Sequence, residues 1–108
     1  MLQSLVQPLR VYLGERKEML MVSGFTDDKP IQEGNRRFAD NLELSAQRAL
    51  TVTRALIEEG MPSSQVFAAA FGAEQPVAPN ADEKGRALNR RVEMASVPRG
   101  TNTDARHP

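Results

Sequence analysis

The sequence contains no cysteine, and this absence excludes several kinds of site at once. A chain without thiols has no disulfide framework, no thiolate metal site and no cysteine nucleophile. Because the cytoplasm and the periplasm both accommodate such chains, the absence identifies no compartment. Long apolar runs are missing too. The opening segment "MLQSLVQPLRVYLGE" is too polar for a signal peptide and far too short for a membrane span.

The sequence has a single histidine and no net charge. The only histidine is His107, near the end of the chain, which disfavours histidine-based catalysis and typical zinc ligation. The 14 basic residues equal the 14 acidic ones, so nothing predicts a general attraction to nucleic acid or to a membrane surface. Asp27 and Asp28 are adjacent, but consecutive side chains diverge, so they do not form a catalytic pair. We therefore expect no enzyme, no metal, no cofactor and no nucleic-acid partner.

The apolar pattern of the first 72 residues predicts a helix followed by two strands with a second helix between them. Residues 2–13 keep helical spacing, with Gly14 as the expected stop and Pro8 either in the first turn or at a bend. The runs "MLMVSGF" (19–25) and "VFAAAFG" (66–72) are typical of buried strands. Residues 26–40 are polar and form a long loop, and loops of that length are often functional.

The second helix has the clearest signals, in "DNLELSAQRALTVTRALIEEG" (40–60). Asp40 or Asn41 is expected to cap its first turn, Glu43 completes a capping box, and Gly60 suits the left-handed residue after the helix. One stripe of small or apolar side chains is expected to face the sheet: Leu42, Ser45, Ala49, Val52 and Leu56.

The remaining residues predict a helical turn at 82–89, a last strand at 90–97 covered on the face of Val92 and Met94, and a disordered tail at 98–108. A strand, a helix and a strand in succession imply a crossover and a parallel strand pair. The predicted fold is therefore an α/β (α+β) sandwich, a mixed sheet with helices on one face, in a single domain over residues 1–97.

Asp27 follows the end of the first strand, and Arg48 lies in the second turn of the helix at 40–60. Both can meet at one edge of the sheet, where α/β folds commonly bind ligands. A carboxylate accepts from an ammonium group, and a guanidinium fork binds a carboxylate, so the pair suits a zwitterionic amino acid centre. The alternative interpretation is a structural salt bridge between the two side chains.

Four ordered motifs resemble the OmpA-like peptidoglycan-binding domain shared by OmpA, Pal-type lipoproteins and MotB-type stator proteins. They are "GFTD" (24–27), "NLELSAQRA" (41–49), "GAEQPVAPN" (72–80) and "GRALNRRVE" (85–93). The resemblance covers about residues 4–97 and is strongest to the MotB-type branch and to type VI secretion relatives. It implies a periplasmic, noncovalent anchor that recognises the diaminopimelate of peptidoglycan, commonly as a homodimer. The parent protein would then associate with inner-membrane motor or secretion subunits.

The same resemblance implies roles for individual residues. Asp27 matches the aspartate of the Gly-His-Thr-Asp motif and is expected to accept hydrogen bonds from a ligand nitrogen. Arg48 matches the arginine of Leu-Ser-x-x-Arg-Ala and is expected to bind a diaminopimelate carboxylate. Thr26, Asn41 and Leu44 match positions that shape the pocket, and capping or packing is their alternative role.

Two features depart from the family pattern. Phe25 replaces the usual histidine beside the aspartate, which removes a polar group from the expected pocket. The family domain also opens with a strand and loop before its first helix, so we expect one strand to be missing here, through truncation or in a natural fragment. An uncovered sheet edge invites pairing with another chain. A degenerate domain that serves in dimerisation or assembly is therefore the alternative function.

The motif "NRRV", which begins at Asn89, is a family hallmark with two possible roles. Two arginines that open a strand, here Arg90 and Arg91, more often hold acidic residues of the fold than bind ligand. We therefore expect a structural role for this motif.

Overall fold

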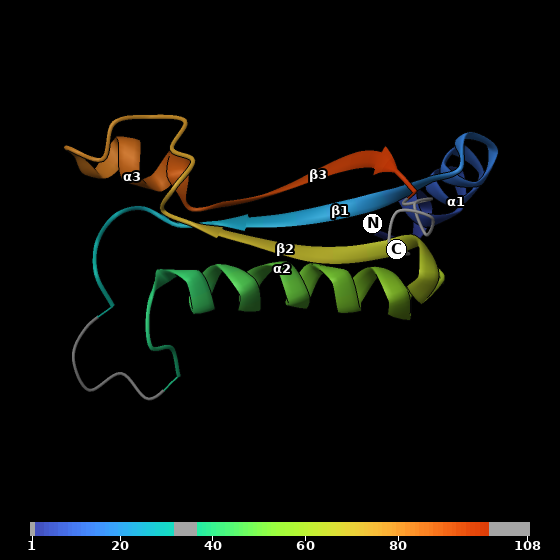
Figure 1. Ribbon diagram of the computed structural model, residues 1–108, viewed down its shortest axis with the longest axis horizontal. Helices are drawn as coiled ribbons and strands as arrows, with labels where there is room; N and C mark the ends of the chain where they lie inside the picture. Colours follow the sequence, from blue (N-terminus) through green and yellow to red (C-terminus); the bar gives the residue numbers. More distant parts are fainter. Residues whose placement is uncertain (1, 32–36, 100–108) are drawn as a thin grey trace, which may run out of the picture.

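The computed structural model describes residues 2–31 and 37–99, which form three helices and three strands (Figure 1). In chain order these are α1 (Leu2–Arg16), β1 (Glu18–Phe25), α2 (Asn41–Glu58), a 3-10 turn (Ser63–Gln65), β2 (Val66–Gly72), α3 (Glu83–Asn89) and β3 (Arg91–Pro98). The predicted order of elements is confirmed. Most of the expected disordered tail, residues 100–108, lies outside the described residues.

The sheet has the strand order β2, β1, β3, so β1 is central. β1 is parallel to β2, with Leu20 opposite Val66, and antiparallel to β3, with Leu20 opposite Ser96. The predicted mixed sheet and the parallel pair are therefore confirmed. Among the described residues, the outer edges of β2 and β3 have no strand partner.

The hydrophobic core lies between one face of the sheet and two helices, as predicted. α1 contributes Val6 and Leu13, and α2 contributes Ala49 and Leu56, to one cluster of buried side chains. The sheet and the turn before it complete that cluster with Leu20, Val22, Met61 and Val66. In Figure 1, α2 runs along β2, while α3 lies beyond the end of the strands. α1 and α2 thus cover one face of the sheet, whereas α3 lies at the end of the sheet.

α2 lies unusually close to β1, and a glycine makes this possible. A Cβ atom placed on Gly24 would lie 2.1 Å from the backbone oxygen of Ser45. The Ser45 hydroxyl donates to the Leu42 carbonyl and accepts from the amide of Gly72, which joins the helix to the end of β2. This close approach fixes the height of α2 above the sheet.

The caps of α2 are confirmed. Asp40 is the N-cap and accepts from the Glu43 amide at 2.9 Å, and the Glu43 carboxylate accepts from the amide of Ala39. Gly60 has φ +115° in the residue after the C-cap. The buried stripe differs from prediction at one end, because Leu42 is 55% exposed. Leu42 lies beside Gly72, the last residue of β2, which has no side chain to cover it.

Two other expectations at the edges of elements were wrong, and one of the two placements left open for Pro8 is excluded. α1 does not stop at Gly14 but continues to Arg16, and Lys17 adopts the left-handed conformation with φ 54°. Pro8 lies inside the helix, which begins six residues earlier at Leu2, so the first-turn placement is excluded. Met94 is 44% exposed although Val92 on the same strand packs against the core. β3 is an edge strand, and α2 packs on β1 and β2, so only the first part of β3 is covered.

Candidate functional site

The candidate site lies at the end of the sheet where β1 and β2 finish and β3 begins. Figure 1 shows that the loop after β1, the first turn of α2 and the short helix α3 all lie at this end. The parallel pair places the carboxyl ends of β1 and β2 together. This is the crevice at which α/β sheets commonly bind ligands.

Asp27 lies two residues beyond the end of β1 and is only 7% exposed. One carboxylate oxygen, Oδ1, accepts from the backbone amide of Lys29 at 3.0 Å. The other, Oδ2, forms an ion pair of 2.7 Å with Nη1 of Arg90. Its sequence neighbours Asp28 and Lys29 are exposed.

The electrostatic environment keeps Asp27 ionised. Burial acts to raise the pKa of Asp27, and it is the largest single influence. The hydrogen bond and charge of Arg90, the amide of Lys29 and the charge of Arg86 together outweigh burial, so the pKa lies below its ordinary value of 3.8. Asp27 is thus a buried, charged acceptor at neutral pH.

Arg90 joins Asp27 to a second acid on α3. Its Nη2 atom is paired with Oε2 of Glu83, whose side chain is 65% exposed. The other oxygen of Glu83 lies 3.4 Å from Nε of Arg86. The hydrogen bond from Arg90 is the main cause that lowers the pKa of Glu83, and Glu83 in turn is the main cause that raises the pKa of Arg90. The predicted role of Arg90, holding acids of the fold, is confirmed.

Arg48 extends from α2 toward the same end of β1 without pairing with Asp27. Its Nη1 atom donates to the carbonyl of Phe25 at 3.4 Å. Phe25 precedes Asp27 by two residues, so the backbone positions of the two lie within about 7 Å. Within residues 2–31 and 37–99, Arg48 forms no ion pair with any acid. The alternative of a structural salt bridge between Asp27 and Arg48 is therefore wrong.

Two of the three supporting residues, Thr26 and Asn41, contact the backbone around Asp27. Thr26 is buried, its hydroxyl donates to the Asp27 carbonyl at 2.8 Å, and its amide donates to the carbonyl of Gly72. The side-chain amide of Asn41 donates to the carbonyls of Asp27 and Lys29 at 3.3 and 3.0 Å. Thr26 and Asn41 thereby fix the loop after β1.

Leu44 lies on the next turn of α2 and is half-buried. Its backbone amide donates to the carbonyl of the N-cap residue Asp40. In the structure Leu44 therefore contributes a backbone hydrogen bond of the first helical turn.

The rest of the "NRRV" motif organises the loop before α3. Asn89 is fully buried, and its Oδ1 accepts from the amides of Val77 and Ala78 at 2.7 and 3.1 Å. Its Nδ2 donates to the carbonyl of Ala78 and to Oδ1 of Asn80, both at 2.8 Å. One side chain thus satisfies four groups of a loop that has no regular structure.

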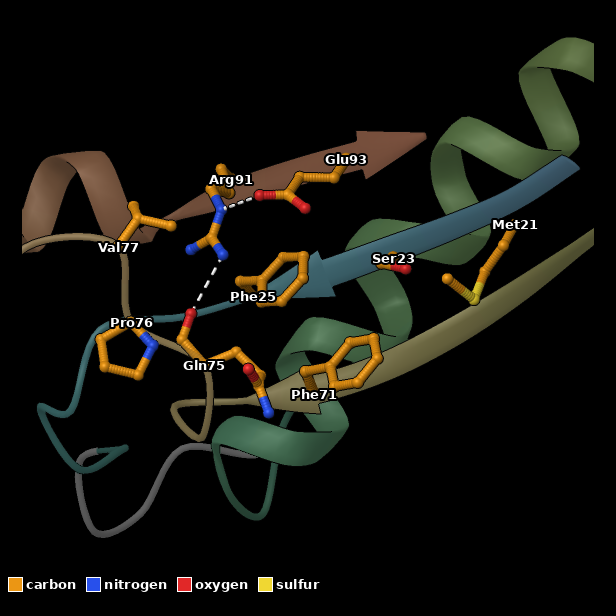
Figure 2. Close-up of a pocket in the computed structure, with 9 residues that line it drawn as sticks. All are labelled: Met21, Ser23, Phe25, Phe71, Gln75, Pro76, Val77, Arg91 and Glu93. Carbon is orange, nitrogen blue, oxygen red and sulfur yellow. Dashed lines mark hydrogen bonds and ion pairs between the residues drawn. The ribbon is translucent and has the colours of Figure 1, made fainter. Parts of the chain in front are cut away.

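Phe25 points away from α2 and lines a pocket of about 290 Å³ on the opposite face of the sheet (Figure 2). Its ring stacks on Phe71 with centroids 5.0 Å apart, and the guanidinium of Arg91 lies 3.8 Å from its centroid. Figure 2 shows Arg91 bonded to Glu93 and to the backbone of Gln75 beside this ring. The residue that replaces the expected histidine is therefore part of an aromatic pair.

Neither Asp27 nor Arg48 lines this pocket. A second hollow of about 350 Å³ lies over the first turn of α2 and the end of β2, and it includes Asn41 and Phe71. Sequence reasoning missed Phe71 as the partner of Phe25, since no local signal predicts which aromatic residues of neighbouring strands will stack. It also missed that the acid held by Arg90 is Asp27, 63 residues away.

Residues 2–31 and 37–99 contain no group of three potential metal ligands. None of the helices described is both long enough and apolar enough to cross a bilayer.

Comparisons with known proteins give one consistent result. The sequence model of the OmpA family matches residues 1–90. Motility protein B of Bacillus subtilis (strain 168) is 42% identical over 82 residues, which are 75% of this chain and 31% of that protein. The peptidoglycan-associated lipoprotein of Pseudomonas aeruginosa is 35% identical over 77 residues, which are 71% of this chain and 42% of that lipoprotein.

A solved structure confirms the likeness of the fold. The C-terminal domain of Helicobacter pylori MotB superposes with a TM-score of 0.72 at 30% identity, over 88% of this chain and 72% of that one. This chain spans less than half the length of either curated relative.

Proposed function

Because this chain belongs to the OmpA family, we propose that it binds cell-wall peptidoglycan noncovalently and anchors a larger membrane-associated complex. The relatives support this function through their names, since one is a peptidoglycan-associated lipoprotein and another is a motility protein. The fold supports it through the likeness to a MotB C-terminal domain. The ligand would be the diaminopimelate residue of the stem peptide.

One observation at the sheet end supports this ligand above others. Asp27 is a buried, ionised carboxylate, and Arg48 donates to the carbonyl of Phe25, two residues before it, with no acidic partner among the described residues. A free amino acid centre carries an ammonium and a carboxylate. The ammonium would donate to Asp27, and the carboxylate would form an ion pair with the guanidinium of Arg48. Each charge-assisted hydrogen bond contributes about 1.5 to 3 kcal/mol.

Thr26, Asn41 and Leu44 would support the site without binding the ligand through charge. Their contacts hold the loop after β1 and the first turns of α2 at a fixed distance from each other. A fixed loop lowers the entropy lost when the ligand orders the site.

The proposed location is the periplasm, where peptidoglycan is accessible. The parent protein would be a motor stator subunit of the MotB type or a related secretion component, and its partners would be inner-membrane subunits. A homodimer would present two binding sites to the same wall, which increases avidity.

The direct test of wall binding is sedimentation with purified sacculi that contain diaminopimelate. The wild-type chain is expected to pellet with the sacculi, whereas Asp27→Asn and Arg48→Gln are each expected to bind at least about tenfold more weakly. Arg54→Gln is the matched control, because Arg54 is an exposed arginine on the same helix. Circular dichroism would establish that each variant is folded. Equal pelleting by all four proteins, or by none, would reject the proposal.

A second candidate is an assembly element that no longer binds the wall. The observation in its favour is that the outer edges of β2 and β3 lack strand partners among the described residues. Phe67, 37% exposed on β2, adds apolar surface near one of these edges. Light scattering after size exclusion would then show a stable dimer from a chain that does not pellet with sacculi, whereas wall binding by a monomer would exclude this candidate.

A further inference from the structure

Arg90 contacts the proposed ligand-binding carboxylate directly, although its own charge is already shared with α3. Its two terminal nitrogens reach two different acids, Nη1 to Asp27 and Nη2 to Glu83. About a third of the Arg90 side chain is exposed. Arg90 is therefore fixed from one side by α3 and fixes Asp27 on the other.

We propose that Arg90, anchored by Glu83, is a positioning residue of the binding site: it orients the Asp27 carboxylate and keeps it as an ionised acceptor for the ligand. This inference rests on the proposed function, and it adds a residue for which sequence reasoning predicted only a structural role. The conclusion follows from three features of the contact, which concern acceptor geometry, charge and the shape of the guanidinium.

The acceptor geometry leaves room for a ligand. An ionised carboxylate has about four lone-pair positions. The amide of Lys29 uses one on Oδ1, and Arg90 uses one on Oδ2 of Asp27. About two positions remain, and the two existing bonds determine their directions. A ligand ammonium therefore meets a carboxylate whose orientation is already set.

The charge of Arg90 offsets the cost of burying Asp27. Burial alone would raise the pKa of Asp27 and favour the neutral acid, which cannot pair with an ammonium. The charged groups that act on Asp27 are Arg90 and, more weakly, Arg86 on α3. From α2, Arg48 approaches only as far as the carbonyl of Phe25. Arg90 is thus the main cation that favours the ionised form.

The planar shape of the guanidinium explains why an arginine is required. Its fork presents separate N–H groups that reach Asp27 and Glu83 at the same time. A lysine ammonium is a compact point charge on a flexible stem. It would restore the charge beside Asp27 but would hold the two acids less rigidly.

The test is a pH profile of binding to diaminopimelate-type sacculi, between pH 7 and pH 3, for the folded chain and its variants. Arg90→Gln is expected to weaken binding at pH 7 about tenfold and to move the acid midpoint of binding to higher pH. Arg90→Lys is expected to have an acid midpoint close to that of the wild type. Its affinity is expected to lie between those of the wild type and Arg90→Gln. Arg54→Gln should match the wild type in both quantities.

Several outcomes would overturn the inference while leaving the proposed function intact. One is a folded Arg90→Gln variant with the affinity and midpoint of the wild type. Another is tighter binding by that variant, which would mean that Arg90 competes with the ligand for Asp27. If Arg90→Gln does not fold, Glu83→Gln replaces it, because Glu83 is exposed. That variant should bind about two- to threefold more weakly, because an exposed ion pair contributes little, and wild-type binding by it would contradict the anchoring role. Absence of binding by the wild type would instead reject the proposed function itself.

Discussion

Substituting Gly24 with alanine tests how closely the fold holds α2, and therefore Arg48, against β1. The new methyl group would lie 2.1 Å from the Ser45 oxygen and 2.9 Å from the Ser45 carbonyl carbon. Both atoms belong to the helix backbone, so no side-chain rotation relieves the contact. α2 would have to retreat by about 1.3 Å for the Ser45 oxygen to reach the 3.4 Å of ordinary contact.

The expected cost follows from two opposing effects. Overpacking a well-packed core costs about 1 to 3 kcal/mol, and replacing a strand glycine returns about 0.5 to 1 kcal/mol through backbone entropy. A contact with backbone as short as that of Gly24 belongs at the upper end, so we expect a net loss of about 2 kcal/mol. For a domain of this size, that loss lowers Tm by roughly 10 °C. Arg48 follows Ser45 by about one helical turn, so binding to sacculi should weaken as well.

Gly14→Ala is the matched control. Gly14 lies within α1, and the nearest atom to its new methyl group, Nε2 of Gln65, is 4.0 Å away. Alanine in a helix interior is favoured over glycine by about 1 kcal/mol, so this variant should raise Tm by a few degrees. Thermal unfolding followed by circular dichroism measures both variants. A Gly24→Ala variant as stable as the wild type would refute the close approach of helix and strand.

Two further predictions concern the loops around the site. Asn89→Ala leaves the amides of Val77 and Ala78 without their side-chain acceptor, and we expect it to cost about 3 kcal/mol in urea unfolding; a loss below about 1 kcal/mol would contradict the four bonds assigned to it. The ion pair of Asp27 with Arg90 predicts a fold that loses stability in acid. The pKa of Asp27 is lower in the folded chain than in the unfolded chain. The ionised Asp27 therefore stabilises the fold fully above the ordinary pKa of 3.8, and this stabilisation is lost as pH falls through the lowered pKa. The urea midpoint of the wild type should therefore fall more steeply below pH 4 than that of Asp27→Asn, and parallel profiles would refute this assignment.

Signals between neighbouring residues predicted much of the fold. The capping box of Asp40 and Glu43 and the glycine at position 60 placed the ends of α2 correctly, because caps depend on contacts within one turn. Gly14 was wrong as the predicted end of α1, because no contact within one turn sets the end of that helix. The helix ends where the chain must turn into β1, and Lys17 takes the left-handed conformation there.

Contacts between distant segments could not be predicted from the sequence. The residue types of the site were recognised, and the resemblance pointed to Asp27 and Arg48, but their actual partners depend on topology. Arg90 reaches Asp27 only because the antiparallel β3 begins where the parallel strands end. The stacking of Phe25 on Phe71 likewise depends on the parallel pairing of β1 with β2, which brings the ends of the two strands together.

The most direct test of the central claim compares two muropeptides by isothermal titration calorimetry, one with diaminopimelate and one with lysine at the same position of the stem peptide. Lysine retains the ammonium that would donate to Asp27 but lacks the carboxylate that would pair with Arg48. We predict that the diaminopimelate muropeptide binds at least about tenfold more tightly, and that Arg48→Gln abolishes the difference. Equal affinity of the wild type for the two muropeptides would contradict the assignment of Arg48 to the ligand carboxylate.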